Sequence, residues 1–216
     1  MSNEFGYIPE SPEQSFGNNK GIFTPTDIYD LTRAEKYTNY GQLELIETKT
    51  VSSSTSSIDF TSIKENIYNV HFLTWNGIEF SANNTYLGAR LSNDGGTSYE
   101  SSNYTYAVQY CSLSGANGEI KSTSASSFER FSWGDIGDVQ NGYCYFYNLG
   151  DSGKFSMLTH HSPPSIESSA GNAFSYFGSQ VYHSVELINA IRFFAHNTTS
   201  NFVNQGTFSL YGIKEY

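Results

Sequence analysis

The chain has 216 residues, about the upper size of a single domain, and its 38% hydrophobic residues are enough to fill a core, which excludes wholesale disorder. Charged residues make up only 15%, while 17 Tyr and 16 Phe accompany abundant Ser, Asn, Thr and Gly, a mixture that favours β-sheet over a helical bundle. The net charge of −10 argues against a nucleic-acid partner, which would need a positive surface.

No apolar run approaches the ~18 residues of a membrane helix, so we expect no membrane insertion. The first residues are polar and acidic and show no signal-peptide pattern. The two cysteines, Cys111 and Cys144, are too few for a disulfide framework. We therefore expect a chain that folds in a cytoplasm with both thiols reduced.

Residues 1–50 are predicted to form an N-terminal arm, one short helix and a docking segment. Prolines favour extended backbone over residues 1–22, and Thr24 is placed to cap a helix running from Pro25 to about Lys36. Apolar side chains in a segment with no core of its own suggest docking on a neighbouring protein. The predicted docking residues are Phe5, Tyr7, Ile8, Phe16, Phe23, Ile28 and Leu31.

Residues 51–216 are predicted to form a β-sandwich. This region begins with a short low-complexity joint at 51–57, and the strand pattern follows it. Asn76-Gly77 predicts a hairpin, and Asn93–Gly96 and Asn117-Gly118 predict turns. Short strands without helix-length crossovers favour an antiparallel sandwich or barrel. The expected strands cover residues 43–47, 70–75, 78–80, 86–91, 104–110, 142–149, 155–158, 174–182, 185–194 and 207–213.

One predicted strand is apolar on both faces. Tyr143, Tyr145 and Tyr147 alternate with Cys144 and Phe146, so one face should meet the core and the other a second layer or a second subunit. We expect the tyrosines to form a subunit interface; cover by the arm and helix of the same chain is the alternative.

Several other residues could form functional sites, but each also has a simpler structural explanation. His160 and His161 could ligate a metal, but adjacent strand residues point to opposite faces, so we expect no metal site. Asp94 could bind calcium, yet the residues after it fit a plain turn. No nucleophile elbow, phosphate loop or zinc-protease motif is present and no pair of carboxylates stands out, so we expect neither an enzyme nor a cofactor.

Aromatic side chains could stack on sugar rings, although strand aromatics more often lie in a core or a subunit interface. The candidates for glycan stacking are Trp75, Trp133, Tyr99 and Tyr104.

Two segments carry a resemblance to a known family. Residues 86–99 read YLGARLSNDGGTSY and residues 206–214 read GTFSLYGIK. Together with 103–106 and 187–192, they resemble jelly-roll virion structural and fibre-like proteins of tailed bacteriophages, of the type found in marine phages. Residues 19–29 are similar to short docking segments that begin some phage structural proteins.

The resemblance covers roughly residues 58–216 and implies an all-β fold: an antiparallel jelly-roll β-sandwich preceded by the arm and helix. It implies a non-catalytic structural protein of the virion, assembled in the host cytoplasm and located on the exterior of the capsid or tail as a decoration or tail-fibre component. The implied partners are other virion proteins and copies of the chain itself, as a homotrimer. The alternative is a receptor-binding fibre or adhesin module that recognises host surface glycan.

Overall fold

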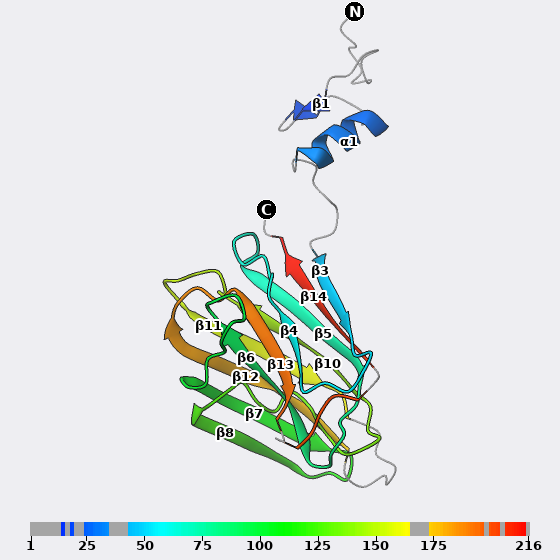
Figure 1. Cartoon of the computed structure of the whole chain (residues 1–216), viewed down its shortest axis with the longest axis vertical. Coiled ribbons are helices and arrows are strands. Elements are labelled where there is room, and N and C mark those ends of the chain that lie inside the picture. Colours follow the sequence, from blue (N-terminus) through cyan, green and yellow to red (C-terminus); the bar gives the residue numbers. More distant parts are fainter. Residues whose placement is uncertain are drawn as a thin grey trace, which may run out of the picture. The chain divides into compact units, whose positions relative to one another are not determined.

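The computed structural model in Figure 1 is built almost wholly from β-strands, with one short helix. It describes residues 14–15, 18–19, 24–34, 43–164, 173–196, 199–203 and 206–214. Every pair of strands is antiparallel, and two sheets pack as a sandwich. The prediction of an all-β, jelly-roll-like sandwich is confirmed.

The chain divides into two compact units, Met1–Gln42 and Leu43–Tyr216. The division falls earlier than the predicted boundary at residue 50. The reason is that Leu43–Thr50 forms an edge strand of the large sheet and pairs along Thr207–Ile213, so these residues belong to the sandwich.

The first unit contains helix α1 (Pro25–Arg33) and two paired two-residue strands, β1 (Gln14–Ser15) and β2 (Asn18–Asn19). Thr24 caps the helix as predicted: its Oγ1 accepts the Asp27 backbone N–H at 3.2 Å, and the Asp27 carboxylate accepts the Thr24 N–H at 2.8 Å. The helix ends at Arg33, earlier than expected. In the part of the chain that the structure describes, no helix is long and apolar enough to cross a bilayer.

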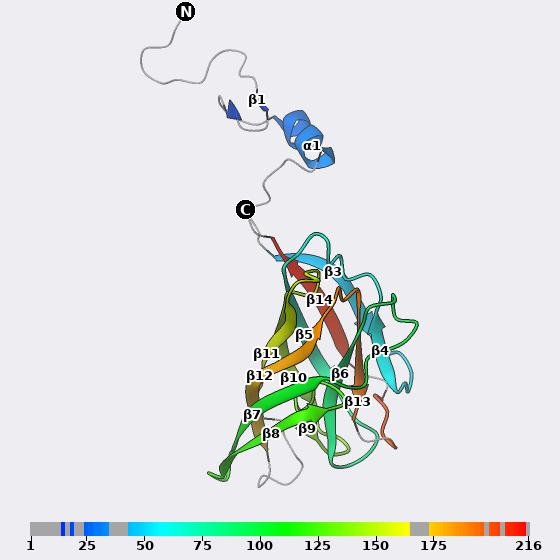
Figure 2. The ribbon, with the colours of Figure 1, turned by 90° about the vertical axis from the view of Figure 1, so that its left-hand side faces the viewer.

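The second unit contains a large and a small sheet, which Figure 2 shows as two layers with β4, β6 and β13 on the right. The large sheet has eight strands in the order β3 (Leu43–Thr50), β14 (Thr207–Ile213), β5 (Val70–Ile78), β10 (Gln140–Tyr147), β11 (Phe155–Ser162), β12 (Phe174–Val185), β7 (Tyr104–Ser112) and β8 (Asn117–Ala125). The small sheet has four strands in the order β4 (Ser57–Phe60), β13 (Ala190–Ala195), β6 (Thr85–Ser92) and β9 (Trp133–Gly134).

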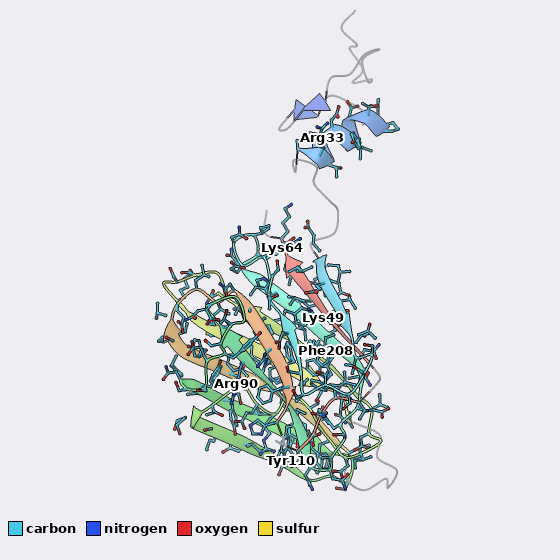
Figure 3. The ribbon with its side chains drawn as sticks, in the orientation of Figure 1. Arg33, Lys49, Lys64, Arg90, Tyr110 and Phe208 are labelled. Atoms are coloured by element: carbon cyan, nitrogen blue, oxygen red, sulfur yellow. The ribbon has the colours of Figure 1, made fainter. Side chains whose placement is uncertain are left out.

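The core lies between the two sheets and is rich in phenylalanine. Phe193 on β13 has no exposed surface, and its ring meets Phe60 on β4 at a centroid distance of 6.5 Å. From the large sheet, Phe208 on β14 approaches the Phe193 ring at 5.5 Å and Phe146 on β10 approaches it at 6.2 Å. Figure 3 labels Phe208 in the interior of the sandwich. Alternation along each strand therefore sends one set of side chains inward and leaves the other set on the outer faces.

The predicted hairpin at Asn76-Gly77 is wrong. β5 runs through both residues without reversing, and Gly77 takes a φ of 68° within the strand. The pairing of β5 with β10 shifts register between Gln140 and Gly142, as at a β-bulge. A Cβ at Gly206 would lie 2.5 Å from the Gly77 carbonyl oxygen, so glycine here permits a close backbone approach rather than a tight turn.

Two further predictions are corrected and one is confirmed. The turn between β7 and β8 contains Gly115, with a φ of 90°, and β8 already begins at Asn117. The predicted strand 185–194 is the end of β12 followed by β13, which belongs to the other sheet. The turn expected at Asn93–Gly96 is present between β6 and β7.

Candidate functional site

A face without charged side chains covers the middle of the large sheet. Three rows of cross-strand partners run over β14, β5, β10, β11 and β12 and together form what we call the aromatic face. The rows are Ile213, Val70, Tyr147, Met157 and Val181; Tyr211, Phe72, Tyr145, Thr159 and Ser179; and Ser209, Thr74, Tyr143, His161 and Phe177. None of them is Asp, Glu, Lys or Arg. Beyond β12 the rows continue across β7 to the edge strand β8. The first charged side chains on this side are those of Glu119 and Lys121 on β8.

Phe72 is the centre of the aromatic face. Its ring centroid lies 4.7 Å from that of Tyr145, 5.9 Å from that of Tyr143 and 6.0 Å from that of Tyr211. Tyr143 also meets the His161 ring at 5.8 Å in an edge-on arrangement. These contacts link four neighbouring strands, so the rings support one another as a continuous surface.

β10 carries this surface on one side and the core on the other, as the alternation predicts. Cys144 and Phe146 are fully buried, whereas Tyr143 keeps 40% of its surface exposed. Tyr145 and Tyr147 are half-buried beside it. The three predicted interface tyrosines therefore lie together on the outer face of the large sheet.

The two cysteines, Cys111 and Cys144, are both free thiols, as predicted.

The predicted docking residues are described only in part. Ile28 and Leu31 lie on α1 and are half-buried. Phe5, Tyr7, Ile8, Phe16 and Phe23 lie outside the described residues.

The four predicted glycan-stacking residues are not brought together on a surface. Trp75 and Tyr104 belong to the core with 1% and 0% of their surface exposed, and Trp133 is buried edge-on against Phe174 at 5.3 Å. Tyr99 is half-buried under the Arg192 guanidinium, whose Cζ lies 4.0 Å from its ring centroid. The stacking prediction is therefore wrong for the three buried residues, because their strands turn these side chains inward.

The two adjacent histidines point to opposite faces, as expected. His160 is buried in the sandwich, where Nε2 lies 3.0 Å from the Arg130 carbonyl oxygen, and burial lowers the pKa of its imidazole to about 4. His161 lies on the aromatic face. Within the described ranges, no group of three or more His, Cys, Asp or Glu residues could hold a metal ion.

Asp94 organises a turn. Its carboxylate accepts the Ser98 backbone N–H at 2.9 Å, the Ser98 hydroxyl at 2.7 Å and the Ser92 hydroxyl at 2.8 Å. These hydrogen bonds lower the pKa of the Asp94 carboxyl to about 2. The carboxylate oxygens are engaged in local turn contacts, as in the plain-turn interpretation.

Some members of the aromatic face could not be recognised from the sequence. Phe72 and Tyr211 lie on strands far from β10 in the chain, and only the register of three strands makes them neighbours of Tyr145. The alternation of each strand, read alone, shows which residues share a face but not which strands adjoin.

In comparisons with known proteins, no family model matches the chain and no curated protein sequence matches it.

Proposed function

We propose that the chain is a non-catalytic structural protein of a bacteriophage virion, a jelly-roll module on the exterior of the capsid or tail that associates with copies of itself through the aromatic face. The virion context rests on the sequence resemblance. The proposed self-association rests on the uncharged, aromatic outer face of the large sheet. The N-terminal arm docks the module on a neighbouring virion protein.

The size of the aromatic face supports an interface. Five strands spaced ~4.8 Å apart and three rows spaced ~6.8 Å apart cover about 500 Å². Exposed apolar patches beyond a few hundred Å² mark interaction sites, and a standard interface buries ~800 Å² on each partner. The footprint of the aromatic face, with its serine, threonine and histidine positions included, therefore amounts to more than half of one side of a standard interface.

Charge favours a second copy as the partner. Each chain carries a net charge of −10, so most approaches of two copies bring like charges together. The aromatic face has no charged side chain within its three rows. Three copies can turn this face toward the axis of a trimer without burying an unpaired charge, and their tyrosine rings and hydroxyls suit a contact that is partly apolar and partly hydrogen-bonded.

The test places a charge at the centre of this face. We expect light scattering to show a trimer for the wild-type chain and monomers for Tyr145→Asp, because an unpaired carboxylate in the contact costs several kcal/mol. Tyr145 is half-buried on the outer face, so the variant should keep its β-sheet circular dichroism. Leu113→Asp is the control: Leu113 is 71% exposed in the β7–β8 turn and should not affect assembly.

Two results would contradict the proposal. One is a Tyr145→Asp variant that remains as stable a trimer as the wild type. The other is a wild-type chain that is monomeric at micromolar concentration, since the trimer is proposed to form through this face without other proteins.

The docking role of the arm has its own test. Deleting residues 1–22 should leave the circular dichroism of the sandwich intact and abolish incorporation of the chain into particles. Normal incorporation of the shortened chain would show that these residues do not dock it.

A further inference from the structure

Two of the three arginines of the sandwich lie opposite each other on the outer face of the small sheet. Residues 43–216 contain three arginines, Arg90, Arg130 and Arg192. Arg90 on β6 and Arg192 on β13 are direct cross-strand partners, and the Arg130 guanidinium lies over the ring of Tyr86, also on β6, at 3.4 Å. Like charges directly opposite each other destabilise a sheet, so this arrangement within an acidic chain calls for an explanation.

The two opposed arginines are not equivalent. Arg192 donates from Nε to Asp59 at 2.7 Å and from Nη2 at 2.6 Å, so a carboxylate already engages one edge of its guanidinium. Arg90 donates from Nε to the Ser126 carbonyl oxygen at 3.1 Å and has no ion pair with any described carboxylate. Arg90 is thus held at Nε while its two terminal nitrogens stay available.

Phe194 positions this available guanidinium. The Cζ of Arg90 lies 5.2 Å from the Phe194 ring centroid, and the His196 ring stacks on Phe194 at 5.9 Å. A cation over an aromatic ring is attracted to it and loses freedom. The Arg90 fork is therefore fixed before any ligand arrives.

A pocket opens at these side chains, with a volume of about 450 Å³. This volume falls within the usual range for small-molecule sites, ~300–1,000 Å³. Its walls combine cationic groups, an aromatic ring and serine hydroxyls: Ser56, Ser57, Arg90, Ser126, Arg192, Phe194, Ala195, His196 and Ser200.

The charges of the pocket lining point to an anionic ligand. Asp59 pairs with Arg192, whereas Arg90 has no ion pair with any described carboxylate. The unpaired Arg90 guanidinium therefore suits a ligand that carries a carboxylate.

We propose that this pocket binds an acidic saccharide, a sugar ring that carries one carboxylate. The Arg90 fork binds the carboxylate through two parallel hydrogen bonds, the geometry that guanidinium and carboxylate share. The hydroxyls of Ser56, Ser57 and Ser126, which also line the pocket, bind the hydroxyl groups of the ring. The site uses the small sheet, whereas the proposed assembly contact uses the large sheet, so either can fail without the other.

The test uses the full chain and glucuronate as the probe, with glucose as the uncharged analogue and inorganic phosphate as the competing anion. The chain has only four arginines, so the Nε–H signals of Arg90 and Arg192 can be followed directly by NMR. We expect glucuronate to shift both signals and glucose to shift neither. Arg90→Gln should weaken glucuronate binding roughly 10- to 100-fold, as expected for the loss of a charge-assisted pair.

Two further variants separate a built site from general charge attraction. Ser126→Ala should weaken binding several-fold, because it removes an exposed hydroxyl from the pocket lining. Lys121→Gln removes one positive charge at the exposed edge strand β8 and should leave the affinity unchanged.

Three results would overturn the proposal. Glucuronate could fail to shift the Arg90 signal at any accessible concentration. Phosphate could bind as tightly as glucuronate, which would make the pocket a general anion site. Arg90→Gln and Lys121→Gln could weaken binding equally, which would show that overall charge alone attracts the ligand.

Discussion

Phe193 is the residue whose removal should test the contact between the two sheets most severely. It lies on the small sheet with no exposed surface and meets Phe60, Phe131, Phe146 and Phe208 at centroid distances between 5.5 and 6.5 Å. Two of these rings, Phe146 and Phe208, belong to the large sheet. Phe193→Ala therefore removes the side chain that joins both layers.

The expected loss follows from the buried area. A buried aromatic side chain covers roughly 150–200 Å², which at ~25 cal/mol per Å² corresponds to about 4 kcal/mol. Measured Phe→Ala changes in cores cost ~3–5 kcal/mol, the remaining cavity included. We expect Phe193→Ala to lower the free energy of unfolding by about 4 kcal/mol. Phe193→Leu, which refills most of the space, should lower it by about 1–2 kcal/mol.

The assay is urea denaturation followed by tryptophan fluorescence. Trp75 is a suitable reporter because it is buried in the same core and meets Phe131 edge-on at 5.9 Å. Leu113→Ala is the control, since Leu113 lies in the turn between β7 and β8 with 71% of its surface exposed. If Phe193→Ala cost no more than Leu113→Ala, the packing of the sandwich described above would be wrong.

Two other predictions concern titration and reactivity. The pKa of His160 is lowered from 6.5 to about 4 in the folded chain, so the unfolded chain binds the proton first and stability should fall as pH drops from about 6.5 to 4. Urea midpoints measured across this range should fall less in His160→Gln than in the wild type; an equal fall in both would contradict the assignment. Burial raises the pKa of the Cys144 thiol, whereas Cys111 is exposed. A thiol reagent should therefore label one cysteine per folded chain and two in denaturant, and rapid labelling of both in the folded chain would contradict the burial of Cys144.

The sequence was sufficient to predict the fold class because the signals for it are local and repeated. Alternating apolar residues at short spacing predict strands, and the Thr24 capping box predicts the start of α1. The Asn76-Gly77 hairpin failed for the opposite reason. Its dipeptide signal is local, but β5 pairs on both sides with β14 and β10, and these long-range pairings keep the chain extended.

The candidate sites, too, could be predicted from the sequence only in part. Alternation along β10 correctly grouped Tyr143, Tyr145 and Tyr147. Composition alone could not show that Trp75 faces the core, since either side of a strand can carry an aromatic residue. The opposition of Arg90 and Arg192 was not predictable, because it arises from the pairing of β6 with β13, strands that are distant in the chain.

The most direct test of the proposed function is a map of the assembled particle at a resolution that separates β-strands. We predict that the sandwich lies on the outside of the capsid or tail and that the aromatic face around Phe72 packs against a second copy of the chain. A particle that lacks this chain, or a map in which that face meets only solvent, would contradict the proposal.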